Sequence, residues 1–255
     1  AYAMTMSSPF ADLTDEEFNA LYLMVPQNCS ATSHVSSGKL VQKTDSVAKH
    51  HHVDWRTRGI ITPIKSQGHC GSCWTFSTTG CLEAHTCLAF SKDCTDWSGF
   101  SEQQLVDCAG DFNNFGCNGG LPSQAFEYIK FRGGINTERS YPYTANETGS
   151  CKSVKDKYSG QVAEVFNITS RDEDDLVHAI ATIGPVSVAY QVSSDFRFYS
   201  HGIYDSYNAT TNQAVCQDGP GDVNHAVVMV GFDEDAHGVP FYIVRNSWGT
   251  SWGME

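Results

Sequence analysis

The stretch Gln67-Gly68-His69-Cys70-Gly71-Ser72-Cys73-Trp74 carries the most chemical information in the chain. Residues 72–90 contain few helix breakers, so we predict a helix that opens just after Gly71. Cys73 then lies in its first turn, where free N–H groups and the positive end of the helix dipole favour a thiolate. Gly68 and Gly71 permit the tight turns that such a start needs. The stretch therefore predicts a nucleophilic cysteine.

Two residues of the second half complete this chemistry. His225 opens a predicted strand at 225–230, and Asn246 follows another at 241–244. A thiolate needs an imidazolium partner, and that ring needs an acceptor that fixes its orientation. The Asn246 side-chain oxygen can accept the ring N–H, and Trp248 can shield that bond from water. Gln67 can donate its amide to the oxyanion formed on a carbonyl, beside the Cys73 N–H.

The secondary-structure signals differ between the two halves. Capping boxes at Ser101/Gln104 and Ser170/Glu173 predict helix starts, and a third helix runs from Pro122 to the Gly133-Gly134 pair. Stretches rich in β-branched and aromatic residues predict strands at 162–168, 185–192, 225–230 and 241–244. Helices first and strands later indicate an α+β protein with two subdomains.

Composition narrows the function classes. With 255 residues the chain forms one large domain or two small ones. A net charge of −13 disfavours nucleic-acid binding, and no apolar run approaches the ~18 residues that span a bilayer. Ten scattered cysteines favour an oxidising compartment, and so do four N-x-[ST] sequons as candidate glycosylation sites. The sequons are Asn28, Asn146, Asn167 and Asn208.

The motif Cys70-Gly71-Ser72-Cys73-Trp74, with a downstream His and Asn, resembles the papain-like cysteine peptidases. Further motifs similar to that family are Asp54-Trp55-Arg56, Ser101–Cys108, Gly116–Gly120, Tyr141-Pro142-Tyr143 and Asn246–Gly249. The resemblance implies a helical left domain and a β-barrel right domain with the active-site cleft between them. It also implies no metal or other cofactor.

Residue roles follow from the same resemblance. Cys73 on the left wall attacks the scissile carbonyl to form a thioester, and His225 on the right protonates the leaving amine and then activates water. Substrate contacts are implied for Gly119, Gly120, Val223 and Trp248, with Val223 lining the apolar pocket for the second residue upstream of the cut.

The implied disulfides are Cys70–Cys117 and Cys108–Cys151, and the implied partner of Cys216 lies in a C-terminal segment beyond this sequence. Cys81, Cys87 and Cys94 depart from the family pattern. A Cys87–Cys94 bond with Cys81 as a buried thiol is one arrangement.

Residues 1–48 differ from the rest, and residues 33–49 read as a polar linker. Phe10–Phe18 resembles the end of the family's inhibitory propeptide, and residues 26–32 resemble the mini-chain of cathepsin H. Residues 111–116 are similar to the plant aleurains. We therefore expect the C-terminal part of a propeptide in 1–48, and in 49–255 a peptidase domain that is truncated at its C-terminus.

The mini-chain resemblance implies an aminopeptidase. A segment tethered through Cys29 and cut after Thr32 fills the cleft upstream of the cut, and its carboxylate pairs with the substrate's α-ammonium. The alternatives are a plain endopeptidase and a catalytically inactive, disulfide-rich binding protein. Expected partners are peptide substrates, the chain's own propeptide and cystatin-like inhibitors. We expect a lysosome or vacuole, or secretion.

Other interpretations of single motifs are less favoured, because no βαβ unit is visible around Cys70 and Cys73, no second close cysteine pair completes a zinc site, and no helix follows Gly249–Gly253. Cys70-x-x-Cys73 is also the spacing of a thioredoxin-like redox site or of half a zinc site. The run His50-His51-His52 can bind metal or be solvated linker, and Gly249–Gly253 has the spacing of a nucleophile elbow.

Overall fold

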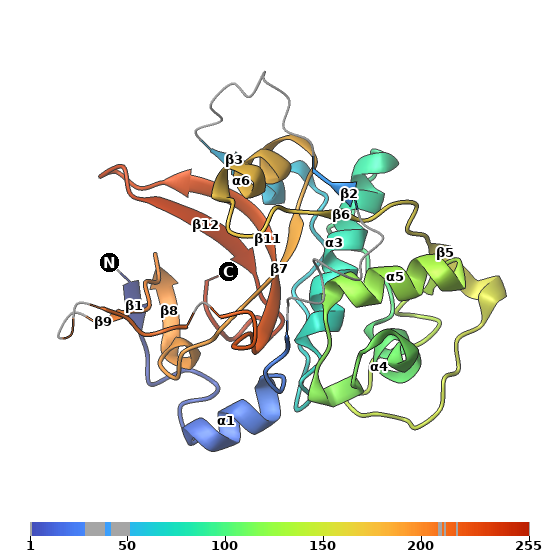
Figure 1. The fold of residues 1–255 in the computed structure, drawn as a ribbon, viewed down its shortest axis with the longest axis horizontal. Coiled ribbons are helices and arrows are strands. Elements are labelled where there is room, and N and C mark those ends of the chain that lie inside the picture. Colours follow the sequence, from blue (N-terminus) through green and yellow to red (C-terminus); the bar gives the residue numbers. More distant parts are fainter. Residues whose placement is uncertain are drawn as a thin grey trace.

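The computed structural model describes residues 2–28, 39–41, 52–208, 211, 213–217 and 219–254. Helices α3 (Cys73–Ala89), α4 (Glu102–Cys108) and α5 (Pro122–Arg132) make one half of the molecule. The second half is built on a sheet, and α3 runs between that sheet and the other two helices (Figure 1). Helices early and strands late confirm the α+β prediction.

The remaining helices and strands are shorter and connect or flank these two halves. They are β1 (Tyr2–Met4), α1 (Asp15–Tyr22), β2 (Lys39–Leu40), β3 (Val53–Asp54), η1 (Trp55–Arg58), η2 (Gly110–Phe112), η3 (Gly116–Asn118), β4 (Ile135–Asn136), η4 (Lys155–Lys157), β5 (Tyr158–Gly160), β6 (Phe166–Asn167), α6 (Glu173–Thr182), β7 (Val186–Tyr190), η5 (Phe196–Phe198), β8 (Tyr199–Gly202), β9 (Tyr207–Asn208), β10 (Gln213–Ala214), β11 (His225–Glu234) and β12 (Pro240–Arg245).

The predicted helix starts are largely found. The first helix was expected over 72–90, and α3 agrees within one residue at each end. Ser101 caps α4 by accepting from the Gln104 N–H at 3.0 Å, but the Gln104 side chain points to Tyr128 and Asn136, so only half of that capping box forms. Gly133, in the left-handed conformation, ends α5.

Two local predictions are wrong. The cap of α6 is Asp172 rather than Ser170, because the Asp172 carboxylate accepts from the Asp175 N–H at 2.9 Å. The strand expected over 162–168 is reduced to β6, since only Phe166 and Asn167 find a partner there, in β2.

The sheet of the second half is antiparallel and centres on β11. The first half of β11 pairs with β7, its end pairs with β3, and β12 pairs along the opposite edge. This pairing places His225 at the start of β11, at the edge where the sheet meets α3.

The N-terminal segment is packed into this body. Helix α1 lies at the lower edge of the view in Figure 1. Thr14 caps it with a complete capping box to Glu17, and its Phe18 is fully buried. Phe18 belongs to a buried cluster that also holds Phe10, Leu23 and Trp248. No described helix is long and apolar enough to cross a membrane.

Candidate active site

Cys73 is the first residue of α3 and is completely buried. Its Sγ accepts a hydrogen bond from the Ala226 N–H at 3.4 Å. Burial raises the pKa of the Cys73 thiol to about 12, although the N–H groups of Ala226, Trp74 and Cys73 itself act in the opposite direction. Desolvation therefore outweighs the helix N-terminus here, and the thiol is neutral near pH 7.

His225 is also completely buried, at the start of β11. One ring nitrogen, Nε2, donates to Asn246 Oδ1 at 2.8 Å. The Ser247 N–H donates to the same oxygen at 2.7 Å, which fixes the orientation of the amide. The Trp248 ring lies over the imidazole with centroids 4.7 Å apart. Burial lowers the pKa of His225 to about 4, against the smaller opposing effect of the Asn246 hydrogen bond.

The expected hydrogen bond between ring and sulfur is not formed. His225 Nδ1 has no hydrogen-bond partner among the described residues, while Cys73 Sγ takes the Ala226 N–H. Because both groups are buried, an ion pair between them would lose its solvation, so the neutral thiol and the neutral imidazole are favoured. In this state both side chains are completely buried, Cys73 as a thiol and His225 as a neutral imidazole.

Gln67 precedes the helix and bridges the two halves. Its Nε2 donates to the carbonyls of Tyr22 and Cys70, both at 2.9 Å. Its Oε1 accepts from the Ser247 hydroxyl at 2.8 Å, and its backbone N–H donates to the Ser247 carbonyl at 2.9 Å. Sequence reasoning missed Ser247, and its place between Asn246 and Trp248 was the available signal.

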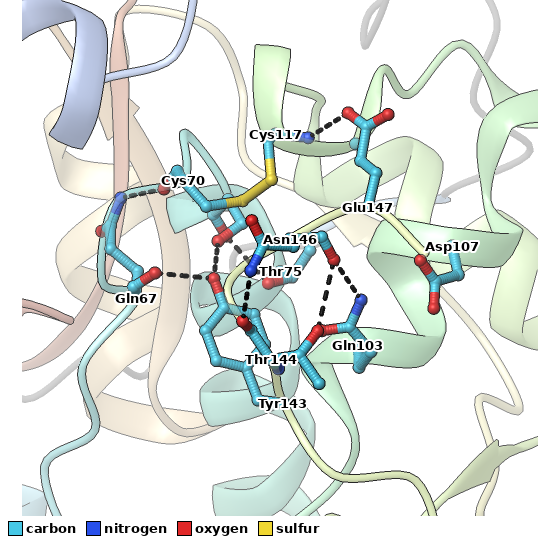
Figure 2. The surroundings of a disulfide bond; sticks show 12 residues. Gln67, Cys70, Thr75, Gln103, Asp107, Cys117, Tyr143, Thr144, Asn146 and Glu147 are labelled. Carbon is cyan, nitrogen blue, oxygen red and sulfur yellow. Dashed lines mark hydrogen bonds between the residues drawn. A yellow bond between two sulfur atoms is a disulfide. The ribbon is translucent and has the colours of Figure 1, made fainter. Parts of the chain in front are cut away.

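Tyr143 contacts the loop that precedes Cys73 through its hydroxyl group (Figure 2). Its hydroxyl donates to the Gln67 carbonyl at 2.7 Å and lies 2.5 Å from the Ser72 hydroxyl. The Cys70–Cys117 disulfide ties the same loop to η3. Residues 67–73 are thus fixed at several points, as a preorganised donor site requires.

The chain itself crosses this site. Hydrogen bonds run from the Met24 N–H to Asn224 O at 3.0 Å and from the Gln27 N–H to Val223 O at 2.8 Å. On the other wall, the Val25 N–H donates to Asn118 O at 3.0 Å. Residues 23–27 therefore lie between the helical half and the sheet, in contact with both.

Two glycines allow this close passage. A Cβ at Gly71 would come within 2.8 Å of the Leu23 carbonyl, and one at Gly119 within 2.8 Å of the Met24 Cβ. Gly119 also has φ +126°, which disfavours a side chain.

The Gly119 backbone forms hydrogen bonds within its own loop, and a Cβ at Gly120 would meet the Trp74 ring at 2.7 Å. The substrate contacts expected of Gly119 and Gly120 stay predictions.

The structure contains the Cys70–Cys117 and Cys108–Cys151 disulfides that the resemblance implies, and also Cys87–Cys94. Cys73, Cys81 and Cys216 are free thiols. Cys29 and Thr32, on which the mini-chain prediction rests, lie outside the described residues, as do His50 and His51.

The sequon asparagines differ in accessibility. Asn28 and Asn146 are exposed, Asn167 is half-buried, and the side chain of Asn208 is outside the described part. Among the residues that the structure describes, no three His, Cys, Asp or Glu side chains are grouped so that they could hold a metal ion.

A cavity of about 370 Å³ lies behind the Gln67 loop, and Lys65, Glu102, Glu138 and Tyr143 contribute to its lining. Lys65 Nζ pairs with Glu102 at 2.7 Å and with the buried Glu83 at 2.9 Å. Burial, together with the negative charge of Glu102, raises the pKa of Glu138 to about 7. The Glu138 carboxyl in this cluster therefore takes up a proton as the pH falls through about 7.

Comparisons with known proteins identify the family of the chain. Residues 50–255 match the family model "Papain family cysteine protease". The chain is 49% identical over 253 residues to "Thiol protease aleurain-like" of Arabidopsis thaliana and 51% identical over 245 residues to "Pro-cathepsin H" of Medicago truncatula. These alignments cover 99% and 96% of this chain but 65% of each relative. The chain thus spans about two thirds of their length.

Solved structures give the same result. Digestive procathepsin L2 from Tenebrio molitor larval midgut superimposes with a TM-score of 0.84 at 34% sequence identity, covering 99% of this chain and 76% of that one. The chain therefore shares its α+β fold, with helices on one side of Cys73 and a sheet on the other, with a solved structure of a procathepsin. The chain belongs to the papain family of cysteine proteases.

Proposed function

We propose that this protein hydrolyses peptide bonds through a thioester on Cys73. The Cys73 sulfur attacks the scissile carbonyl carbon, and the carbonyl oxygen becomes an oxyanion that Gln67 Nε2 and the Cys73 N–H stabilise. As the sulfur attacks, His225 Nδ1 takes the proton of the Cys73 thiol, and it gives that proton to the leaving amine as the C–N bond breaks. The ring then removes a proton from water, which attacks the thioester and releases the acid and the thiol.

The contacts of the site support these roles. Asn246 and Trp248 hold the His225 ring from two sides, so that Nδ1 stays available for proton transfer. Gln67 already donates to a peptide carbonyl, that of Tyr22, which shows that its amide can reach a backbone oxygen here. Peptide carbonyls are the group that the reaction polarises.

Residues 1–48 act as the end of an inhibitory propeptide in this proposal. Residues 23–27 use backbone hydrogen bonds to Val223, Asn224 and Asn118, the groups that a substrate strand would need. Two of the solved structures that resemble the chain are named procathepsins. The 49–255 part is then the peptidase domain, and departure of the segment restores water to Cys73 and His225.

The mature enzyme acts mainly as an aminopeptidase of the cathepsin H type. The observation that carries this step is the antiparallel bridge between Gln27 and Val223, which the resemblance puts on the side upstream of the cut. If residues 26–32 stay tethered through Cys29 after cleavage behind Thr32, they block long chains on that side. The new carboxylate then selects the substrate's free α-ammonium.

Paired substrates test the aminopeptidase proposal. Full-length protein is matured at acidic pH, and kcat/KM is compared for an amino-acyl dye amide and its N-acetylated form. We expect a preference of about 100-fold for the free amine, lost in Cys29→Ser protein whose 26–32 peptide dissociates. Equal cleavage of both substrates by the wild type identifies a plain endopeptidase. Absence of cleavage, together with no adduct at Cys73 from a thiol-directed epoxide, identifies an inactive binding protein.

The ten cysteines and the sequons also support a secretory route to a lysosome or vacuole, where a low pH favours the protonated imidazole. Peptide substrates and cystatin-like inhibitors are the partners of the open site. Endoglycosidase treatment and peptide mass mapping at Asn28, Asn146, Asn167 and Asn208 check the route. Unmodified asparagines at all four positions in protein from its own cells would contradict glycosylation.

A further inference from the structure

Arg197, in η5, is an arginine buried by the N-terminal segment. Its side chain is 9% exposed, and its Nη1 donates to the Asp15 carboxylate at the start of α1 and to Ser194 O at 2.9 Å. Its buried Nε has no hydrogen-bond partner among the described residues. The structure gives Arg197 no other salt bridge in the described part of the chain. Asp15 thus supplies the carboxylate, and one donor stays unused.

Residues outside the N-terminal segment also contact Arg197. Arg197 Cζ lies 4.5 Å from the Phe198 ring centroid, and the Arg197 carbonyl accepts from Trp252 Nε1 at 3.1 Å. The neighbouring Phe196 packs on Trp252 and Trp248, the ring that covers His225. These contacts do not involve the N-terminal segment. They keep Arg197 in place beside the site when the segment leaves. Asp15 departs with the segment, and so do the Phe18 ring, 5.9 Å from Arg197 Cζ, and the Ser8 hydroxyl that donates to the Arg197 carbonyl at 2.6 Å.

The path of the N-terminal segment shows on which side of the active site Arg197 lies. Residues 25–27 lie against Asn118, Gly119 and Val223, the side proposed for substrate residues before the cut. The Tyr22 carbonyl accepts from Gln67 Nε2, the proposed oxyanion donor, so Tyr22 lies at the position of the cut. Helix α1, which ends at Tyr22, packs on the Trp248 ring through Phe18, on the other side of that position. Arg197 therefore faces the side where the leaving part of a substrate must lie.

We propose that Arg197 determines specificity by binding a carboxylate on the leaving-group side of the substrate, in the place that Asp15 takes in this structure. Asp15 is seven residues before Tyr22, which is about 10 Å along a helix. An extended peptide covers that length in about three residues. The carboxylate belongs to the third residue after the cut, as an Asp or Glu side chain or as the C-terminus. This inference rests on the proposed peptidase function.

Matched peptides test it in the matured enzyme. The first pair places Asp or Asn third after the cut in a longer amidated peptide, and the second ends at that residue with a free acid or an amide. Wild-type kcat/KM is expected to be about tenfold higher for the charged member of at least one pair, and 0.5 M NaCl reduces that ratio. In Arg197→Gln the ratio falls to about 1, and in Arg197→Lys it is intermediate. The pair that responds identifies the source of the carboxylate.

Arg58→Gln is the matched control, because Arg58 is exposed in η1 and outside the site. It is expected to keep the wild-type ratio. A ratio near 1 for both pairs in the wild type, or an equal loss of the ratio in Arg58→Gln, overturns the inference. A dye amide without a leaving peptide separates the two proposals: if wild type fails to cleave it and both peptide pairs, the peptidase function itself is wrong.

Discussion

Gln67 Nε2 donates a hydrogen bond to the Tyr22 carbonyl, 2.9 Å away. The donor that the proposed chemistry needs for an oxyanion is therefore occupied by a carbonyl of the same chain. Neighbouring residues of that segment close the site over Cys73 and His225, which are both completely buried. In the proposed function a single contact thus links inhibition and catalysis, since the same Gln67 amide serves both states.

The first prediction concerns thiol reactivity. With the Cys73 pKa at about 12, the thiolate is scarce near neutral pH while the N-terminal segment is in place. We expect iodoacetamide at pH 6 to label Cys73 at least about tenfold more slowly in the unprocessed chain than after maturation. Peptide mapping must separate Cys73 from the free thiols Cys81 and Cys216. Equal rates before and after maturation would show that the segment does not suppress the thiolate.

The second prediction concerns Ser247 as a positioning residue. Its hydroxyl donates to Gln67 Oε1 and so turns Gln67 Nε2 toward the reacting carbonyl. Loss of Gln67 itself in Gln67→Ala is expected to lower kcat about 100-fold. Ser247→Ala is expected to lower kcat about tenfold with little change in KM, and Ser247→Thr to restore part of the loss.

A double-mutant cycle separates positioning from general destabilisation. If Ser247 acts only through Gln67, then Ser247→Ala costs little further activity once Gln67 is alanine. Independent, additive losses would show that Ser247 supports the fold rather than the amide. The melting temperature of each variant is measured alongside.

How far the sequence predicts this site depends on the range of the interactions. Cys73, His225 and Asn246 follow from residue types beside predicted helix and strand ends, and the family motifs relate them across 173 positions, from 73 to 246. The neutral state of the thiol could not be predicted. It depends on residues 23–27 folding back over the site, and burial then outweighs the helix N-terminus that local reasoning invoked.

Side chains that act through tertiary contacts were missed for the same reason. Tyr143 was recognised only as part of a motif, because its bonds to Gln67 and Ser72 join segments some 70 residues apart. Arg197 had no local signal, since its partner Asp15 is 182 residues away. Ser170 and Asp172 both have side chains that can cap α6. Residue type alone could not predict which of them does so, because the cap depends on where the backbone turns from the extended to the helical conformation, which is at Asp172.

The third prediction concerns the pH dependence of stability. The raised pKa of Glu138 means that the folded chain binds this proton more tightly than the unfolded chain, so the contribution is complete below the unfolded pKa of about 4.5 and is lost as pH rises to about 7. His225 acts in the opposite direction between about pH 4 and 6.5, because its folded pKa is lowered. The comparison must therefore be made between variants.

We expect Glu138→Gln to remove the Glu138 part of the slope. Relative to wild type, the variant becomes more stable as pH rises from 4.5 to 7, by on the order of 1 kcal/mol since the carboxyl is only half-buried. Urea unfolding of the full chain at several pH values measures this difference. A difference that stays constant across the range would contradict the raised pKa.

The last prediction concerns how α1 holds the N-terminal segment. Phe18 is fully buried and meets the Trp248 ring edge-on at a centroid distance of 5.3 Å, and Phe10 contacts both rings, at 5.4 Å from Phe18 and 5.5 Å from Trp248. Phe18→Ala removes this packing, at a cost of about 3–5 kcal/mol for a buried phenylalanine. Because the lost contacts join α1 to the body, the cost appears mainly as weaker closure of the site. We expect faster autoprocessing at acidic pH and faster Cys73 labelling before maturation. Phe90→Ala is the matched control, since Phe90 is 78% exposed and is expected to change neither rate. If both variants process like the wild type, the segment is held by its backbone bonds to Asn118, Val223 and Asn224 rather than by α1.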